Sequence, residues 1–245
     1  MVPQSRTPIV LLTRPAAQSA RFAATLQARF GPLRIITSPL IAPRFLTPAL
    51  PGRPWSALIL TSETAVQSAQ RIIADGGHLP PLAFCVGDHT ADAARAIDLN
   101  PVSAQGDAAA LIALILSQQP KGPLLHLQAR DTRGDFTATL NSAGIETHSA
   151  VTYSQETQPL TPQATHILTG QDPLLIPLFS PRTASHFAAE CHRIGATAPM
   201  TLVMMSGAIA KAAASLSANP LIAARTDAEA MLDALTTCMA DAGKP

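Results

Sequence analysis

The sequence predicts an α/β fold of two similar domains, each built on a doubly wound parallel sheet of the flavodoxin-like kind. Short apolar runs alternate with helical segments along the chain, which is typical of parallel sheets covered by helices on both faces. The run 82–86 stops at Gly87 and leads into an Ala-rich helical segment, as a buried strand that feeds a helix does. The same arrangement returns 120 residues later, where the run 201–205 leads to Gly207.

The repeat extends to the neighbours of these glycines. Asp107 returns as Asp227 at a step of 120, and Ser62 returns as Ser180 at a step of 118. Because these matches keep one order and nearly one spacing, they predict an internal duplication.

The opening segment predicts a strand, a helix and a second strand. Pro8–Thr13 is apolar, and Ala16–Phe30 carries large apolar residues at helical spacing after Pro15, which suits a first helical turn. Gly31 ends the helix, and the second strand is expected at 33–38.

The middle of the chain predicts a loop followed by three strand–helix pairs. The Pro-rich residues 42–56 are expected to form the loop. The strands are expected at 55–60 and 82–86, with a weak strand near 101–102. The helices are expected at 63–74, from Thr90 onward, and from Asp107 to Ser117. Thr61 or Ser62 is the expected N-cap of the first of these helices.

The last part predicts the second half of the repeat. We expect a strand at 124–127, a helix at 135–142 ended by Gly144, strands at 146–153 and 165–168, a short strand and a helix within 175–195, the strand and helix around Gly207, and a final helix at 227–241.

Composition limits the function. Of 245 residues, 47% are hydrophobic and 13% charged, which is ample for a large core and argues against disorder. A net charge of +1 without a basic cluster argues against a nucleic-acid partner. The three cysteines show no CxxC spacing, and the spacing of His186 and His192 does not fit a helical metal pair. We therefore expect neither a disulfide framework nor a metal site.

Targeting signals are not evident. The first residues lack the apolar core of a signal peptide, and no segment is apolar for long enough to span a bilayer. We expect a soluble, cytoplasmic protein without a membrane partner.

Anion binding is the function that the strand–helix junctions favour, because helix N-termini offer free N–H groups and the positive end of the helix dipole. The sequence contains neither GxGxxG nor GxxxxGK[ST], which counts against a nucleotide-dependent enzyme. A two-lobed, non-catalytic binding module stays open.

The ordered set of short motifs resembles one family, the uroporphyrinogen-III synthases. The motifs are Thr13-Arg14-Pro15, Ser38-Pro39-Leu40-Ile41, Leu60-Thr61-Ser62, Val86-Gly87-x-x-Thr90, a strand then Arg130, Val151-Thr152-Tyr153, Phe179-Ser180-Pro181, and Gly207 with a terminal Asp/Glu-Ala helix. The resemblance implies two α/β domains joined by two linker strands. One is discontinuous, 1–37 plus 156–245; the other, 40–151, is inserted, with linkers near 38–40 and 152–155.

The resemblance also implies an activity. Family members close hydroxymethylbilane into uroporphyrinogen III, inverting ring D and losing water, with no cofactor and no metal. We expect a monomer with this small-molecule substrate. The alternative is a non-catalytic two-lobed module that binds a tetrapyrrole or another polyanion.

The resemblance places the site residues. Tyr153, the one tyrosine of the chain, is the expected catalytic residue, whose hydroxyl group would assist departure of the ring A hydroxyl group. The expected substrate-binding residues are Arg14, Ser62, Gly87, Thr90, Arg130, Ser180, Ser206 and Gly207. Helix capping alone would also explain Ser62, Ser180 and Thr90. The second copy has Ala210 where the first has Thr90, so its glycine turn would offer backbone donors only.

Overall fold

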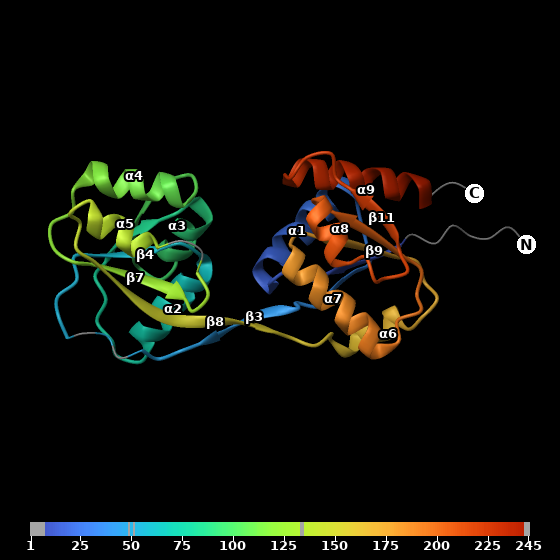
Figure 1. Ribbon diagram of the computed structural model, residues 1–245, viewed down its shortest axis with the longest axis horizontal. Coiled ribbons are helices and arrows are strands. Elements are labelled where there is room, and N and C mark those ends of the chain that lie inside the picture. Colours follow the sequence, from blue (N-terminus) through green and yellow to red (C-terminus); the bar gives the residue numbers. More distant parts are fainter. Residues whose placement is uncertain (1–7, 49, 51, 133–134, 243–245) are drawn as a thin grey trace, which may run out of the picture. The chain divides into compact units, whose positions relative to one another are not determined.

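The chain forms two compact α/β units. The computed structural model describes residues 8–48, 50, 52–132 and 135–242 (Figure 1). Unit 1 comprises Met1–Ala42 with Thr157–Pro245, and unit 2 comprises Pro43–Glu156. The chain therefore enters unit 2 within one strand, β3 (Ile41–Phe45), and leaves it within another, β8 (Thr147–Thr157).

Unit 1 contains a five-stranded parallel sheet. In the order β11-β10-β9-β1-β2, its strands are Asn219–Ile222, Met200–Met204, Leu174–Leu178, Ile9–Leu12 and Ile35–Thr37. Its helices are α1 (Ala16–Phe30), α6 (Pro162–Leu168), α7 (Pro181–Ile194), α8 (Gly207–Ala212) and α9 (Ala228–Ala242).

Helices cover both faces of this sheet. Along β1, side chains alternate between the faces: Ile9 and Leu11 belong to the core under α6, α7 and α8, while Val10 and Leu12 belong to the core under α1 and α9. All four are buried, which explains why β1 reads as a continuous apolar run.

Unit 2 contains a six-stranded sheet in the order β3-β8-β7-β4-β5-β6. The four strands not yet bounded are β7 (Leu124–Ala129), β4 (Ala57–Leu60), β5 (Leu82–Cys85) and β6 (Asn100–Ser103). The cores place α2 (Glu63–Ala74) and α3 (Asp88–Arg95) on one face, and α4 (Ala108–Gln118) and α5 (Phe136–Ser142) on the other.

The strand orders confirm the duplication. The order β2-β1-β9-β10-β11 in unit 1 corresponds to β8-β7-β4-β5-β6 in unit 2, and both are the flavodoxin-like 2-1-3-4-5 arrangement when β1 and β7 are taken as strand 1. Leu26 on α1 and Leu140 on α5, which occupy matching helices, are both fully buried. The predicted α/β class with parallel sheets is confirmed.

Three predictions of individual elements were wrong. Residues 41–45 form the edge strand β3 although a loop was expected there, because Pro43 is tolerated at a sheet edge. Residues 165–168 belong to helix α6, which Thr161 caps and Pro162 begins. The edge strand β11, with Pro220, was not predicted. Among the described residues, no helix combines the length and apolar character needed to cross a membrane.

Candidate functional site

The strand order of each unit reverses at one place, between β1 and β9 in unit 1 and between β7 and β4 in unit 2. In open α/β sheets, ligands bind beyond the carboxyl ends of the strands at such a reversal. Four predicted site residues directly follow these strand ends or lie within two residues of them: Arg14 and Ser180 in unit 1, Arg130 and Ser62 in unit 2. Each unit therefore carries one candidate binding region beyond the carboxyl ends of its strands at this reversal. We call this region the edge of the unit; it holds Arg14 and Ser180 in unit 1, and Arg130 and Ser62 in unit 2.

In unit 1, the edge carries a half-buried cation, Arg14. Its guanidinium group lies 4.1 Å from the centroid of the Phe179 ring, and its Nε donates to Oε1 of Gln18 at 3.1 Å. Phe179 is held in turn by Phe22, with 5.0 Å between ring centroids. Burial, followed by the nearby charge of Arg21, lowers the pKa of Arg14.

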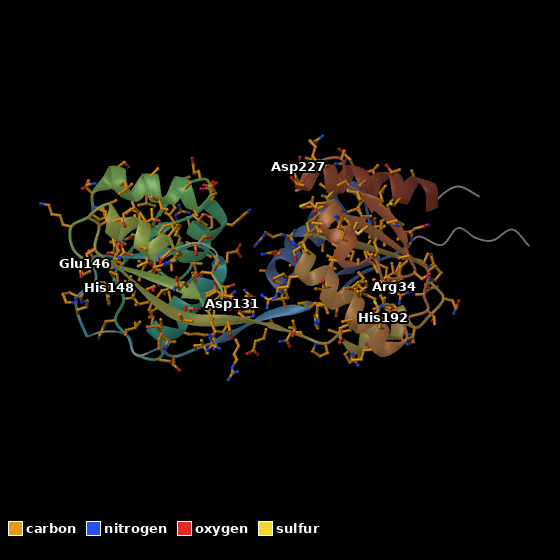
Figure 2. The ribbon with its side chains drawn as sticks, in the orientation of Figure 1. Arg34, Asp131, Glu146, His148, His192 and Asp227 are labelled. Carbon is orange, nitrogen blue, oxygen red and sulfur yellow. The ribbon has the colours of Figure 1, made fainter. Side chains whose placement is uncertain are left out.

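Arg14 has no carboxylate partner among the described residues, whereas seven of the fourteen arginines of the chain form ion pairs. Elsewhere, arginines form ion pairs; on unit 2, for example, Nη1 of Arg53 lies 2.6 Å from Oε1 of Glu146, beside His148 (Figure 2). His148 and Arg53 together lower the pKa of Glu146. Ion pairs are also formed by Arg29, Arg34, Arg44, Arg95, Arg193 and Arg225. A half-buried guanidinium group without such a partner is suited to an anionic ligand.

The helix starts of unit 1 are capped by small residues. The Oγ of Ser180 accepts from the N–H of Thr183 at 3.2 Å and donates to Oγ1 of Thr183 at 2.9 Å. Ser206 precedes α8 without a side-chain cap bond, and a Cβ at Gly207 would meet no atom within 4 Å. The Gly207 turn therefore has room beside its backbone.

In unit 2, the edge carries a pair of hydroxyl groups. The Oγ of Ser62, the N-cap of α2, accepts from the N–H of Ala65 at 3.1 Å and lies 3.0 Å from the hydroxyl oxygen of Tyr153. Tyr153 is 5% exposed and lies on β8. The N–H of Arg130 donates to the carbonyl oxygen of Tyr153 at 2.8 Å. The structure thus brings together Ser62 and the backbone of Arg130 around Tyr153, while the Arg130 side chain is exposed.

The first glycine turn is covered by a neighbouring segment. Gly87 precedes α3, and the N–H of Gly106 donates to the carbonyl oxygen of Val86 at 3.1 Å. Thr90 is only 5% exposed. Gly87 and Thr90 therefore lie near the Ser62 edge along the sheet, with the Thr90 side chain packed inside the unit.

The matching helices of the two edges differ in charge. In unit 1, α1, α7 and α8 have no acidic residue in the first turn. Their counterparts in unit 2 each have one at or just before the first position: Asp135 for α5, Glu63 for α2 and Asp88 for α3. A carboxylate at a helix N-terminus competes with an anionic ligand for the same N–H groups, so the edge of unit 1 is the better anion site.

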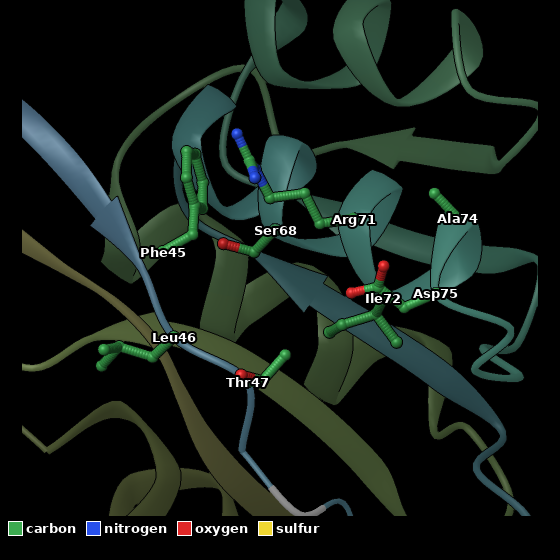
Figure 3. Close-up of a pocket in the computed structure, with 8 residues that line it drawn as sticks. All are labelled: Phe45, Leu46, Thr47, Ser68, Arg71, Ile72, Ala74 and Asp75. Carbon is green, nitrogen blue, oxygen red and sulfur yellow. The ribbon is translucent and has the colours of Figure 1, made fainter.

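Two pockets within the units are lined by other residues. One of about 380 Å³ in unit 2 is formed by α2 and the segment after β3 (Figure 3). One of about 530 Å³ in unit 1 includes His192 and Ser215. None of the predicted site residues lines either pocket.

Sequence reasoning missed two features of the edges, the packing of Phe179 under Arg14 and the contact between Ser62 and Tyr153. The second was accessible in principle, because the flavodoxin-like order places strand 2 and strand 3 on either side of strand 1. Within the described part of the chain, no group of three His, Cys, Asp or Glu side chains could hold a metal.

A family model and solved structures match this chain. The model of the family described as uroporphyrinogen-III synthase HemD matches residues 21–233. The crystal structure of uroporphyrinogen-III synthetase from Helicobacter pylori has a similar fold, with a TM-score of 0.61 and 16% identity, over 94% of this chain and 99% of that one. A mutant uroporphyrinogen III synthase from Thermus thermophilus gives a TM-score of 0.46 and 13% identity, over 96% and 99% of the two chains. A comparison with curated proteins gave no match.

Proposed function

The chain belongs to the uroporphyrinogen-III synthase family, and we propose that it closes hydroxymethylbilane into uroporphyrinogen III with inversion of ring D and loss of water. The observation that carries this proposal is the family match over residues 21–233, which spans most of both units. We include in the proposal a monomeric, cytoplasmic enzyme that needs no cofactor, as the family resemblance implies.

Substrate binding has to rest on local donors, because a substrate with eight carboxylates meets a chain of net charge +1. In the proposal, Arg14 contacts a substrate carboxylate, and the backbone N–H groups beyond Ser180, Ser206 and Gly207 contact others. Arg130 and the turn at Gly87 and Thr90 contribute from unit 2. The lack of acidic residues at the matching helix starts of unit 1 supports the larger share for that unit.

The reaction requires a proton for the departing hydroxyl group and a fixed conformation of the substrate. Loss of the ring A hydroxyl group leaves an azafulvene cation, ring D attacks through its substituted carbon, and the resulting spiro intermediate breaks and recloses. We propose that this proton originates from Tyr153, whose hydroxyl group lies at the unit 2 edge beside Ser62. The binding residues hold the chain in the conformation that favours type III closure over spontaneous type I closure.

The test is product analysis. The purified protein is given freshly made hydroxymethylbilane, and the type I and type III isomers are separated by chromatography after oxidation. We expect type III to replace type I as the main product. A product mixture identical to the protein-free control would contradict the enzyme function, and binding without turnover would favour the two-lobed binding module.

A further inference from the structure

We propose that Ser62 is the residue that gives a proton to the departing hydroxyl group of the substrate, and that Tyr153 replaces that proton from behind. This inference rests on the proposed function and concerns its first chemical step. In this proposal Ser62 is the catalytic residue that contacts the leaving hydroxyl group. Tyr153 is a positioning residue that acts through Ser62.

Burial favours Ser62 as the residue in contact. Tyr153 is 5% exposed and belongs to the core cluster of Leu127 and Ala150. Its strand β8 is separated from β4, the strand before Ser62, by β7, a distance of about 10 Å at ordinary strand spacing. The phenol ring therefore reaches from β8 toward Ser62, which lies half-buried at the end of β4.

The hydrogen bonds give the pair a direction. The 3.0 Å contact allows either hydroxyl group to be the donor. In the proposed relay Tyr153 is the donor, because a phenol is a more acidic hydroxyl group than an alkyl alcohol. The Oγ of Ser62 then accepts from both Tyr153 and the N–H of Ala65. Both acceptor positions of the Ser62 oxygen are then used. The O–H group of Ser62 is left to donate a hydrogen bond to a ligand.

The proposed step balances. The C–O bond between the ring A methylene group and its hydroxyl group breaks, and the electron pair leaves with oxygen. Ser62 gives its proton to that oxygen, which departs as water, while Tyr153 gives its proton to Ser62. Ring A becomes an azafulvene cation and Tyr153 a phenolate. The proton that the last pyrrole carbon loses on ring closure returns through Ser62 to the phenolate.

Unit 1 provides a natural contrast. Ser180 occupies the matching position and caps α7 in the same way, but its hydroxyl group donates to Oγ1 of Thr183. The counterpart of β8 is β2, and the residue after it, Ser38, accepts from the N–H of Thr161 at 2.9 Å. The hydroxyl proton of Ser180 is therefore used in a hydrogen bond within the protein. Among the described residues of unit 1, this edge also has no tyrosine that could replace the proton.

The experiment compares three variants in the isomer assay. We expect Ser62→Gly to lower kcat for the type III isomer by about 100-fold, since glycine is tolerated as an N-cap but cannot donate a proton. Tyr153→Phe keeps the Ser62 hydroxyl group and should lower kcat less. The double variant should be no slower than Ser62→Gly, because Tyr153 acts only through Ser62.

Two results would overturn the relay. If Tyr153→Phe is as slow as the double variant while Ser62→Gly is clearly faster, Tyr153 contacts the substrate directly. If the two losses multiply, the residues act independently. Ser62→Thr, which keeps both hydroxyl group and cap, should restore most of kcat; a threonine variant as slow as glycine would also contradict the relay.

The remaining controls separate folding and function. Asp107→Ala removes the cap of α4, where Oδ1 accepts from Ala109 and Ala110, and should lower thermal stability while keeping kcat. Wild-type protein is assayed in parallel. If wild type forms no type III isomer, the proposed function fails; if it does and Ser62→Gly equals wild type, the relay alone fails.

Discussion

Units 1 and 2 share the order of five strands and the placement of the helices that match between them, apart from the added β3 in unit 2 and the added α6 in unit 1. Their matching edges nevertheless carry different chemistry. Unit 1 places a half-buried arginine on an aromatic ring and keeps acidic residues away from three helix starts. Unit 2 places a tyrosine and a serine in contact and has an acidic residue at each matching helix start. The duplicated frame has been kept while the side chains have diverged.

This difference indicates a division of work between the copies. Backbone N–H groups at helix starts are available in either copy, but a carboxylate at a helix N-terminus offsets the charge that would attract an anion. Under the proposed function, unit 1 would contribute most of the binding energy for carboxylates, and unit 2 would contribute the hydroxyl groups of the proposed proton relay.

The largest expected difference between the units is in acid stability. His126 on β7 is buried, and neither ring nitrogen has a partner among the described residues. Burial lowers its pKa from 6.5 to about 4. The unfolded state therefore binds more protons between these values, and unit 2 should lose about 3 kcal/mol as pH falls through this window. The matching face of β1 carries Val10 and Leu12.

Unit 1 should resist acid to a lower pH. There Arg193, followed by the N–H of Leu160, helps to lower the pKa of Glu190 from 4.5 to about 2, so this contribution is present above pH 4.5 and is lost only as pH falls toward 2. Hydrogen exchange resolved by peptide should show unit 2 opening first. His126→Leu should remove most of this difference, whereas the exposed His78→Gln should not; simultaneous opening in wild type would contradict the assignment.

The second effect concerns substrate binding. Arg14→Gln removes the half-buried cation and should raise KM about tenfold, the loss of about 1.4 kcal/mol from one charge-assisted hydrogen bond. Arg130→Gln is the matched variant in unit 2 and should raise KM less, because its side chain is exposed. Steady-state kinetics at constant ionic strength makes the comparison. Equal changes in KM would contradict the inferred division of work.

The smallest effect tests the packing of unit 1. Arg29 on α1 pairs with Glu229 at 3.1 Å and Asp233 at 2.8 Å on α9. These groups are partly or largely exposed, so Arg29→Met should lower stability by only about 0.5 kcal/mol, measured by urea unfolding. The difference should disappear in 1 M salt. A loss that persists at high salt would show that packing of the arginine stem, rather than charge, is responsible.

The sequence predicted those elements that have local signals. The helices Ala16–Phe30 and Glu63–Ala74 agree with the structure to the residue, since Gly31 and Ser62 mark their ends. The strands β3 and β11 were missed because Pro43 and Pro220 read as loop signals, whereas both lie in edge strands. In α6, the short apolar run Thr165–Leu168 resembled a strand because short runs do not distinguish the two periods.

The candidate site was less predictable. The choice of Arg14, Ser62, Arg130 and Ser180 came from the family resemblance, and the structure places all four at or within two residues of strand ends. The pairing of Ser62 with Tyr153 could not follow from local pattern, because 91 residues separate them. The burial of Thr90 and Tyr153 likewise depends on tertiary packing, which periodicity alone does not specify.

The insertion of unit 2 into unit 1 has a consequence for biosynthesis. β1 leaves the ribosome early, but its neighbour β9, with Ile9 opposite Leu174, is translated only after all of Pro43–Glu156. One side of the apolar β1 can pair early with β2, but its other side must wait for β9 while the contiguous second unit can already fold. Nascent chains stalled shortly after Glu156 should be the species most prone to bind chaperones, and slow translation there would prolong that exposure.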